Sequence, residues 1–132
     1  MIVLDASVVV DVTLARPSAE SELSDRLAEH GTDLHAPHLI DAEVVQVLRR
    51  YVVRKWMTPA RASDAVDLLI GMPITRYPHV GLLHRALQLR RNLTVYDALY
   101  VALAEALDAP LLTRDAGIAR AAKRLVDVVH IP

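Results

Sequence analysis

The stretch that most constrains this chain runs from Leu93 to Leu107 and reads LTVYDALYVALAEAL. Apolar residues occupy nearly every position, so a helix formed here has little polar face and should lie inside the fold rather than on its surface. Thr94 is a good N-cap residue, and Asp97 falls in the first turn, where a carboxylate complements the free backbone amides. Burying an acid is costly unless a positive charge meets it. Asp97 is therefore either a capping residue only or part of a functional site.

The chain has 132 residues, enough for one domain with a genuine core, and we expect a single domain over residues 1–132. It contains no cysteine, which excludes disulfides and thiolate metal sites. No apolar run approaches the roughly 20 residues that span a bilayer, and no leader-like segment precedes the first apolar run, so we expect a cytoplasmic protein without a membrane partner. Hydrophobic residues make up 53%, an excess that predicts surface buried against a partner or a second copy. The formal net charge of −1 gives no overall basic field of the kind that indicates nucleic-acid binding.

Short apolar segments alternate along the chain with segments of helical character. We expect strands at 1–4, 33–36, 74–77, 111–113 and 126–129, with helices at 7–14, 19–30, 37–55, 59–72, 80–91, 94–107 and 118–125 and a loop at 16–18. Short apolar strands alternating with helices are typical of a parallel sheet that is covered on both faces. The sequence therefore predicts a three-layer α/β/α domain with a parallel central sheet.

Four carboxylates stand at the ends of these expected elements, each within apolar sequence. Asp5 directly follows the first strand and Asp115 follows the 111–113 strand, while Glu43 and Asp97 lie in the first halves of two helices. Active sites of open parallel sheets gather at the carboxyl ends of the strands, so these four residues, here called the acidic quartet, could converge on one pocket. Each also has a structural interpretation. Asp5 or Asp115 could cap a helix or form a turn, and Glu43 could be a solvated helix position.

A cluster of four carboxylates repels itself strongly in a low-dielectric site, and a hard divalent cation relieves that repulsion. All-oxygen sites suit Mg²⁺ or Mn²⁺, and a cation held in this way can activate water for attack on a phosphodiester. Ser7 and Thr113 add hydroxyl groups that could orient the carboxylates or a bound water.

Two other classes of acidic site at the end of a first strand are excluded. A phosphatase of the haloacid dehalogenase type needs a second aspartate two residues after the first, where this chain has Ser7. A response-regulator receiver needs an adjacent acidic pair near the first strand and a lysine after the last one. The segment before Asp5 lacks the pair, and Lys123 is badly placed.

Four segments together resemble the PIN domain family and, at this chain length, its bacterial VapC toxins in particular. The match keeps its order and spacing from Met1 to the C-terminus, and the long helix and the Thr-Arg-Asp segment are its most specific parts. The segments are Val3-Leu4-Asp5-Ala6-Ser7, Glu43, Leu93 to Ala104, and Leu111-Leu112-Thr113-Arg114-Asp115.

The resemblance implies a Mg²⁺- or Mn²⁺-dependent endoribonuclease that acts on cellular RNA. It also implies a homodimer and neutralisation by a cognate VapB-like antitoxin, whose tail often directs an arginine into the acidic site. Carried over by position, the acidic quartet would be both the catalytic and the metal-binding set, with Ser7 and Thr113 as supporting hydroxyls. Many relatives have a further acid two residues after the fourth, where this chain has Gly117, so one ion or two remain open alternatives.

Basic and apolar side chains suggest two further surfaces. On the 37–55 helix, Arg50 and Arg54 fall within about 20° of Glu43, so they could bind RNA phosphates next to the cut or form an ordinary solvated face. For the antitoxin contact, we expect the apolar segment Val66, Leu69, Ile70 and Met72.

Two other functions fit the same sequence. One is a catalytically silent PIN-like binding module, whose acidic pocket only receives an arginine from a partner. The other is a nuclease that processes RNA or cuts DNA and is not a toxin.

Overall fold

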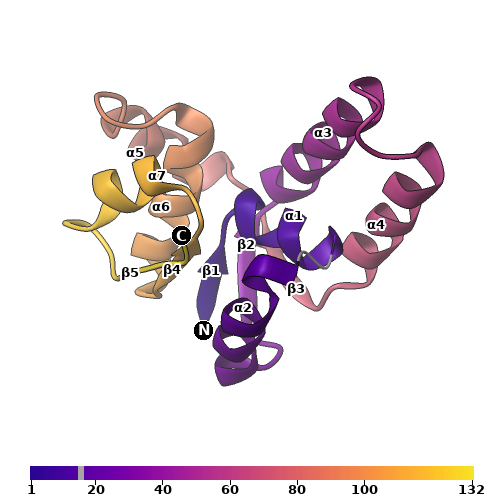
Figure 1. The fold of residues 1–132 in the computed structure, drawn as a ribbon. Coiled ribbons are helices and arrows are strands. Elements are labelled where there is room, and N and C mark those ends of the chain that lie inside the picture. The colour runs from indigo at the N-terminus through magenta and orange to yellow at the C-terminus, as the bar shows by residue number, and fades with distance from the viewer. Residues whose placement is uncertain (15–16) are drawn as a thin grey trace.

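The computed structural model describes residues 1–14 and 17–132 and contains one five-stranded parallel sheet (Figure 1). The strand order is β3-β2-β1-β4-β5, and every neighbouring pair is parallel. The predicted central parallel sheet is confirmed. The strands are β1 (Ile2–Leu4), β2 (Leu34–Pro37), β3 (Ile74–Tyr77), β4 (Leu111–Thr113) and β5 (Val128–His130).

Helices cover both faces of this sheet, so the three-layer prediction is confirmed. Figure 1 shows α1 to α4 on one side and α5 to α7 on the other, as right-handed crossovers require when the strand order reverses at β1. The described helices are α1 (Ala6–Leu14), α2 (Pro17–His30), α3 (Leu39–Val53), α4 (Pro59–Gly71), α5 (Leu83–Gln88), α6 (Val95–Leu107) and α7 (Ala116–Ala122), with a 3₁₀ turn η1 (Val80–Leu82) before α5.

The reversal of strand order fixes the place of the functional site. The chain leaves β1 toward α1 on one face and leaves β4 toward α7 on the other, although β1 and β4 are neighbours in the sheet. Chains that diverge from adjacent strands open a crevice beyond the carboxyl ends of those strands. Asp5 and Asp115 both lie at this crevice, because each follows one of the two strands within two residues.

Helix α6 is the buried helix that its composition predicts. All residues from Ala98 to Ala104 are buried, because α6 packs on β1, β2 and β4 on one side and on α5 on the other. Its N-terminus is fixed by Thr94, whose Oγ1 accepts a hydrogen bond from the backbone N–H of Asp97 at 3.2 Å. The apolar sequence of this helix therefore places Asp97 at a defined position on the edge of the core.

Four expected boundaries are wrong. In the expected loop at 16–18, Arg16 lies outside the described residues, and Pro17 already begins α2, as a residue without an N–H readily does at a helix start. Pro37 is the last residue of β2, where it pairs with Tyr77, and not the first residue of a helix. The expected 80–91 helix is divided into η1 and α5 and ends at Gln88, and the last strand is shifted to Val128–His130.

Among the described residues, none of the helices combines the length and the apolar character needed to cross a bilayer.

Candidate active site

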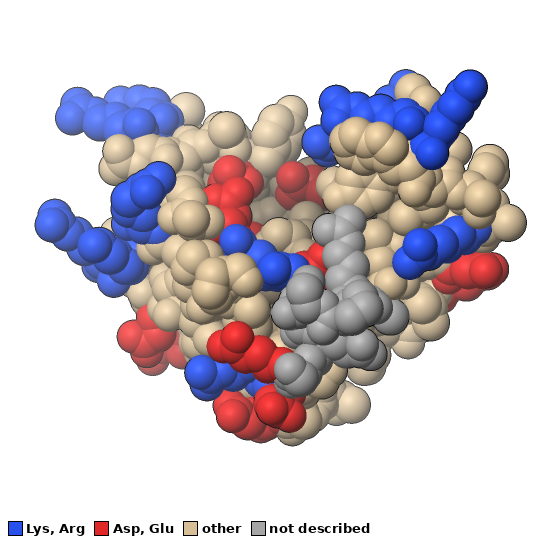
Figure 2. Space-filling model, in the orientation of Figure 1, with Lys and Arg blue, Asp and Glu red and all other residues tan. Residues whose placement is uncertain are grey.

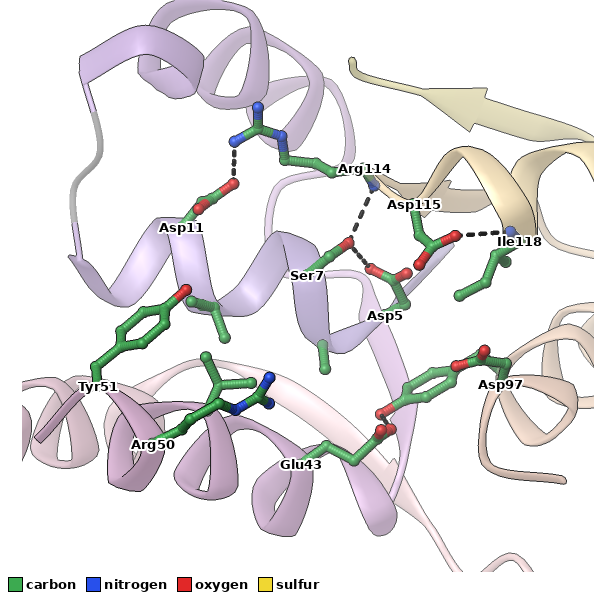
Figure 3. Close-up of a pocket in the computed structure, with 14 residues that line it drawn as sticks. Asp5, Ser7, Asp11, Glu43, Arg50, Tyr51, Asp97, Arg114, Asp115 and Ile118 are labelled. Carbon is green, nitrogen blue, oxygen red and sulfur yellow. Dashed lines mark hydrogen bonds and ion pairs between the residues drawn. The ribbon is translucent and has the colours of Figure 1, made fainter. Parts of the chain in front are cut away.

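A cavity of about 460 Å³ opens at the crevice beyond β1 and β4, and all four members of the acidic quartet line it. They come from four different parts of the chain: the end of β1, the first half of α3, the first turn of α6 and the start of α7. Figure 2 shows acidic side chains inside this hollow, and Figure 3 shows the quartet directed toward a common space. The structure therefore brings together the four carboxylates that the sequence singles out.

Asp5 is the most buried member, with 2% of its surface exposed. Its Oδ1 accepts hydrogen bonds from Ser7 Oγ at 2.5 Å and from the Val8 backbone N–H at 3.3 Å, and its Oδ2 accepts one from Thr113 Oγ1 at 2.5 Å. Burial raises the pKa of Asp5 to about 6, since the hydrogen bonds only partly offset the loss of water, and the nearby charge of Asp115 adds to the rise. Asp5 thus caps α1 and also lines the cavity.

Ser7 and Thr113 join the two strand ends through Asp5. Besides donating to Asp5, Ser7 Oγ accepts the Arg114 backbone N–H at 3.0 Å, and Thr113 Oγ1 accepts the Asp115 backbone N–H at 2.9 Å. Both hydroxyls therefore fix the carboxylate of Asp5 and the backbone that carries Asp115.

Glu43 is held by Tyr100, a residue without an expected role. The buried Tyr100 donates its hydroxyl hydrogen to Glu43 Oε1 at 2.6 Å. Burial raises the pKa of Glu43, the bond from Tyr100 opposes that rise, and the charge of Asp97 adds to it. Burial and the charge of Glu43 also raise the pKa of Tyr100, so its hydroxyl remains a proton donor. The available signal was position, because Tyr100 lies one turn after Asp97 on the same helix face.

Asp97 and Asp115 complete the quartet from α6 and α7. Asp97 is half-buried, and its pKa is raised first by burial and then by the charge of Asp115. Asp115 is exposed and caps α7, because its Oδ1 accepts the Ile118 backbone N–H at 2.9 Å. Asp115 therefore both caps α7 and lines the cavity.

A second pair on the cavity wall, Asp11 and Arg114, was also missed. The Arg114 guanidinium donates from Nη1 to the buried Asp11 and from Nη2 to the Pro132 backbone carbonyl at 3.1 Å. Asp11 lies four residues after Ser7 on α1, so both face the cavity, as Figure 3 shows. The pair ties the β4–α7 connection to α1.

The donor set fits a hard divalent cation. It consists of carboxylate oxygens, the ligands that Mg²⁺ and Mn²⁺ prefer. Mutual repulsion contributes to the raised pKa values of Asp5, Glu43 and Asp97, as expected where acids await a positive charge. In the side-chain conformations of residues 1–14 and 22–132, no three such groups are close enough to hold one ion together. Binding by three of them would therefore require side-chain rotation.

The predicted basic stripe divides in the structure. Arg50 is exposed and lines the rim of the cavity, whereas Arg54 follows the end of α3 and lies over the ring of Trp56, 5.0 Å from its centroid. Within the described chain neither arginine forms an ion pair, so no acid of the next helix neutralises Arg50.

The predicted apolar contact segment is wrong in part. Leu69 is 2% exposed and belongs to the core, because it lies on the face of α4 that packs inward. Val66 and Met72 are partly buried against the same core, which leaves Ile70 exposed, together with Leu68.

Comparison with known proteins decides the family of this fold and site. The model of the PIN domain matches residues 2–124. The chain belongs to the PIN domain family. It is 45% identical over 120 residues to Ribonuclease VapC1 of Mycobacterium tuberculosis, covering 90% of this chain and 89% of that one. It is 37% identical over 132 residues to a VapC ribonuclease of Mycobacterium bovis, covering 100% and 99%.

Solved structures show the same fold at low sequence identity. PAE2754 of Pyrobaculum aerophilum superposes with a TM-score of 0.72 at 22% identity, covering 96% of this chain and 87% of that one. The structure of VapBC2 from Rickettsia felis, bound to a DNA fragment from its promoter, gives a TM-score of 0.67 at 16% identity, with 98% of both chains covered.

Proposed function

We propose that this protein is a Mg²⁺- or Mn²⁺-dependent endoribonuclease and the toxin of a toxin–antitoxin pair. The observation that carries the proposal is the convergence of the acidic quartet in one cavity at the switch point of the sheet. Relatives at 37–45% identity that bear the name VapC ribonuclease support it.

Each part of the cavity has a distinct task in phosphodiester hydrolysis. Asp5, Glu43, Asp97 and Asp115 would hold the cation, which supplies an activated water and stabilises the charge that develops on the phosphate. Ser7 and Thr113 hold the carboxylate of Asp5 by hydrogen bonds, and Tyr100 holds that of Glu43. Arg50 at the rim would bind a phosphate beside the one that is cut.

The partner that fits this cavity is a VapB-like antitoxin with an arginine in its tail. Among the described residues, five acids and two arginines line the cavity, and Arg114 is already paired with Asp11. A guanidinium can bind carboxylates with two parallel hydrogen bonds. An arginine bound in this way would block the site, and its binding would not require a metal. We also infer a homodimer and a cytoplasmic location for the active toxin.

RNA cleavage by the purified protein tests the proposal. Total cellular RNA is incubated with Mg²⁺ or Mn²⁺ and then with EDTA, alongside Asp5→Asn and Asp97→Asn. Discrete fragments that disappear with EDTA and in both variants are expected, and mapping their ends identifies the target. Intact RNA, or equal cleavage by the variants, would favour the silent binding module.

A growth assay separates a toxin from a processing nuclease. Expression of the protein should arrest growth, and co-expression of a small protein encoded beside it should relieve the arrest. Cleavage of RNA without growth arrest would instead support a processing enzyme.

A further inference from the structure

A second hollow continues from the acidic cavity along α7. Its volume is about 590 Å³, and it shares Asp97, Asp115 and Ile118 with the acidic cavity. From there it follows the face of α7 that carries Gly117, Arg120 and Ala121, at the helical spacing of three and four residues, and it ends at Arg124. We call this hollow the α7 groove. The two hollows therefore adjoin at Asp97, Asp115 and Ile118, with the rest of the acidic quartet in the first hollow.

The far end of the α7 groove is basic. Arg120, Lys123 and Arg124 line it, and all three are exposed. No acid within the described residues forms an ion pair with any of them, so their charges remain available to a ligand. Arg91 extends the basic lining, because it borders a smaller hollow that also contains Arg124. Figure 2 shows Lys and Arg side chains on both sides of the acid-lined hollow, over the α5–α7 side and over the end of α3.

Gly117 lies where the two hollows meet. A Cβ atom at this position would lie 3.1 Å from Asp115 Oδ1, so a larger residue would require a small shift of that carboxylate. The seven residues of α7 span about 10 Å. A short stretch of an extended bound strand would therefore reach from the quartet to the cations.

We propose that the α7 groove binds the sugar–phosphate backbone of unpaired RNA on one side of the phosphate that is cut. This inference rests on the proposed ribonuclease function and assigns residues for which the sequence suggests no role. One phosphate of a bound RNA has to lie among carboxylates that repel it. The attraction therefore has to act on the phosphates on either side of it. Arg120, Lys123 and Arg124 supply that attraction on the α7 side, as Arg50 does on the α3 side. Such contacts position a strand without reading its sequence.

Binding measured in EDTA tests the groove separately from catalysis. The probe is a fluorescently labelled single-stranded RNA of about 20 nucleotides, and its anisotropy is followed at several salt concentrations. The test variant is Arg120→Ala/Lys123→Ala/Arg124→Ala. The control variant is Arg49→Ala/Lys55→Ala/Arg90→Ala, which removes three exposed positive charges that line neither the acidic cavity nor the α7 groove. Thermal unfolding of both variants verifies that they fold.

The groove variant should bind the RNA at least tenfold more weakly than the control variant. The slope of log K against log salt is negative, and its magnitude should be smaller by about 2 in the groove variant. Each phosphate contact with a single strand contributes about 0.7 to that magnitude. Equal affinities of the two variants, or no measurable binding by the parent protein, would overturn the inference. Displacement of the RNA by polyglutamate at equal charge would also overturn it, since the groove would then be a general anion surface that fits an acidic protein segment.

The proposed function fails by a different result. If the parent protein does not cut RNA with Mg²⁺ or Mn²⁺ but the groove variant loses affinity, the groove assignment stands and the nuclease does not. If the parent cuts RNA and both variants bind it equally, the nuclease stands and the groove assignment does not.

Discussion

At the scale of single residues, assembly of the acidic site lowers the stability of the fold. Asp5 is buried among apolar residues next to other acids, and three hydrogen bonds do not restore the ordinary pKa of its carboxyl group. The folded protein therefore holds the proton of Asp5 more tightly than the unfolded chain does. A group of this kind lowers stability once it ionises.

The substitution Asp5→Asn should stabilise the metal-free protein at neutral pH while it abolishes RNA cleavage. Between pH 3.8 and about 6 the native state binds more protons at this site than the unfolded state, so stability falls as pH rises through that range. The full penalty above pH 6 is about 3 kcal/mol. Asparagine carries no charge, so the free energy of unfolding of the variant should gain about 2 kcal/mol relative to the parent between pH 4.5 and pH 7.

Urea unfolding in EDTA at both pH values measures this difference. Asp67→Asn on the exposed face of α4 is the control, and it should change the free energy of unfolding by a similar small amount at either pH. A constant difference between Asp5→Asn and the parent across this pH range would show that Asp5 ionises normally.

Tyr100→Phe should lower RNA cleavage about tenfold, because Glu43 loses the hydroxyl group that holds it. The lost hydrogen bond also keeps the pKa of Glu43 down, so the acidic limb of the pH–rate profile should move to higher pH in the variant. Loss of one such bond costs about 1 kcal/mol of stability.

Tyr77→Phe is the matched control, since it removes a hydroxyl at 2.6 Å from His35 Nδ1 outside the cavity. It should lose comparable stability without moving the pH profile. An identical profile in Tyr100→Phe and the parent would leave Tyr100 with a packing role only.

At the scale of elements, the caps of α6 and α7 connect local sequence to the site. Thr94 fixes the first turn of α6, which carries Asp97, and Asp115 is itself the cap of α7. The same residues thus start the helices and place the acids.

Thr94→Ala should cost about 1 kcal/mol of stability and lower cleavage further than that loss explains, because the first turn of α6 would no longer hold Asp97 in place. Thr58→Ala offers a matched control: Thr58 Oγ1 accepts the Arg61 backbone N–H at 3.2 Å, the same bond at the start of α4. Both variants should unfold at similar urea concentrations, while only Thr94→Ala loses activity. Thr94→Ser should restore it. Equal activity of the two alanine variants would show that the Thr94 cap does not contribute to cleavage.

The sequence predicts elements with a strong local signal and fails where tertiary contacts decide. The long apolar helix, the start of the 59–72 helix and the 111–113 strand are confirmed at their expected positions. Pro37 was misplaced, because its pairing with Tyr77 outweighs its preference for a helix start. The four acids could be chosen because they follow strands or open helices. The partners of Tyr100 and Arg114 could not be chosen, because they lie 57 and 103 residues away in the chain, although Tyr100 itself stands one turn after Asp97.

At the scale of the whole molecule, the reversal of strand order at β1 gathers acids from four distant segments. The α1–α4 side contributes Glu43 and the α5–α7 side contributes Asp97, so the cavity lies between the two helical layers (Figures 1 and 3). An ion bound there would join segments that otherwise repel each other. Binding of a ligand to the native state alone stabilises the fold by mass action.

Mg²⁺ or Mn²⁺ should therefore raise the melting temperature of the protein. At a concentration 100 times the Kd, the gain is about 2.7 kcal/mol, and for a chain of this size that corresponds to roughly 10 °C. Differential scanning fluorimetry measures the shift, with NaCl at equal ionic strength as the control for screening. Asp5→Asn/Asp97→Asn should show no shift beyond that of NaCl, because two of the four carboxylates are gone. If the double variant gains as much as the parent, the stabilising ion binds elsewhere and the acidic quartet is not the metal site.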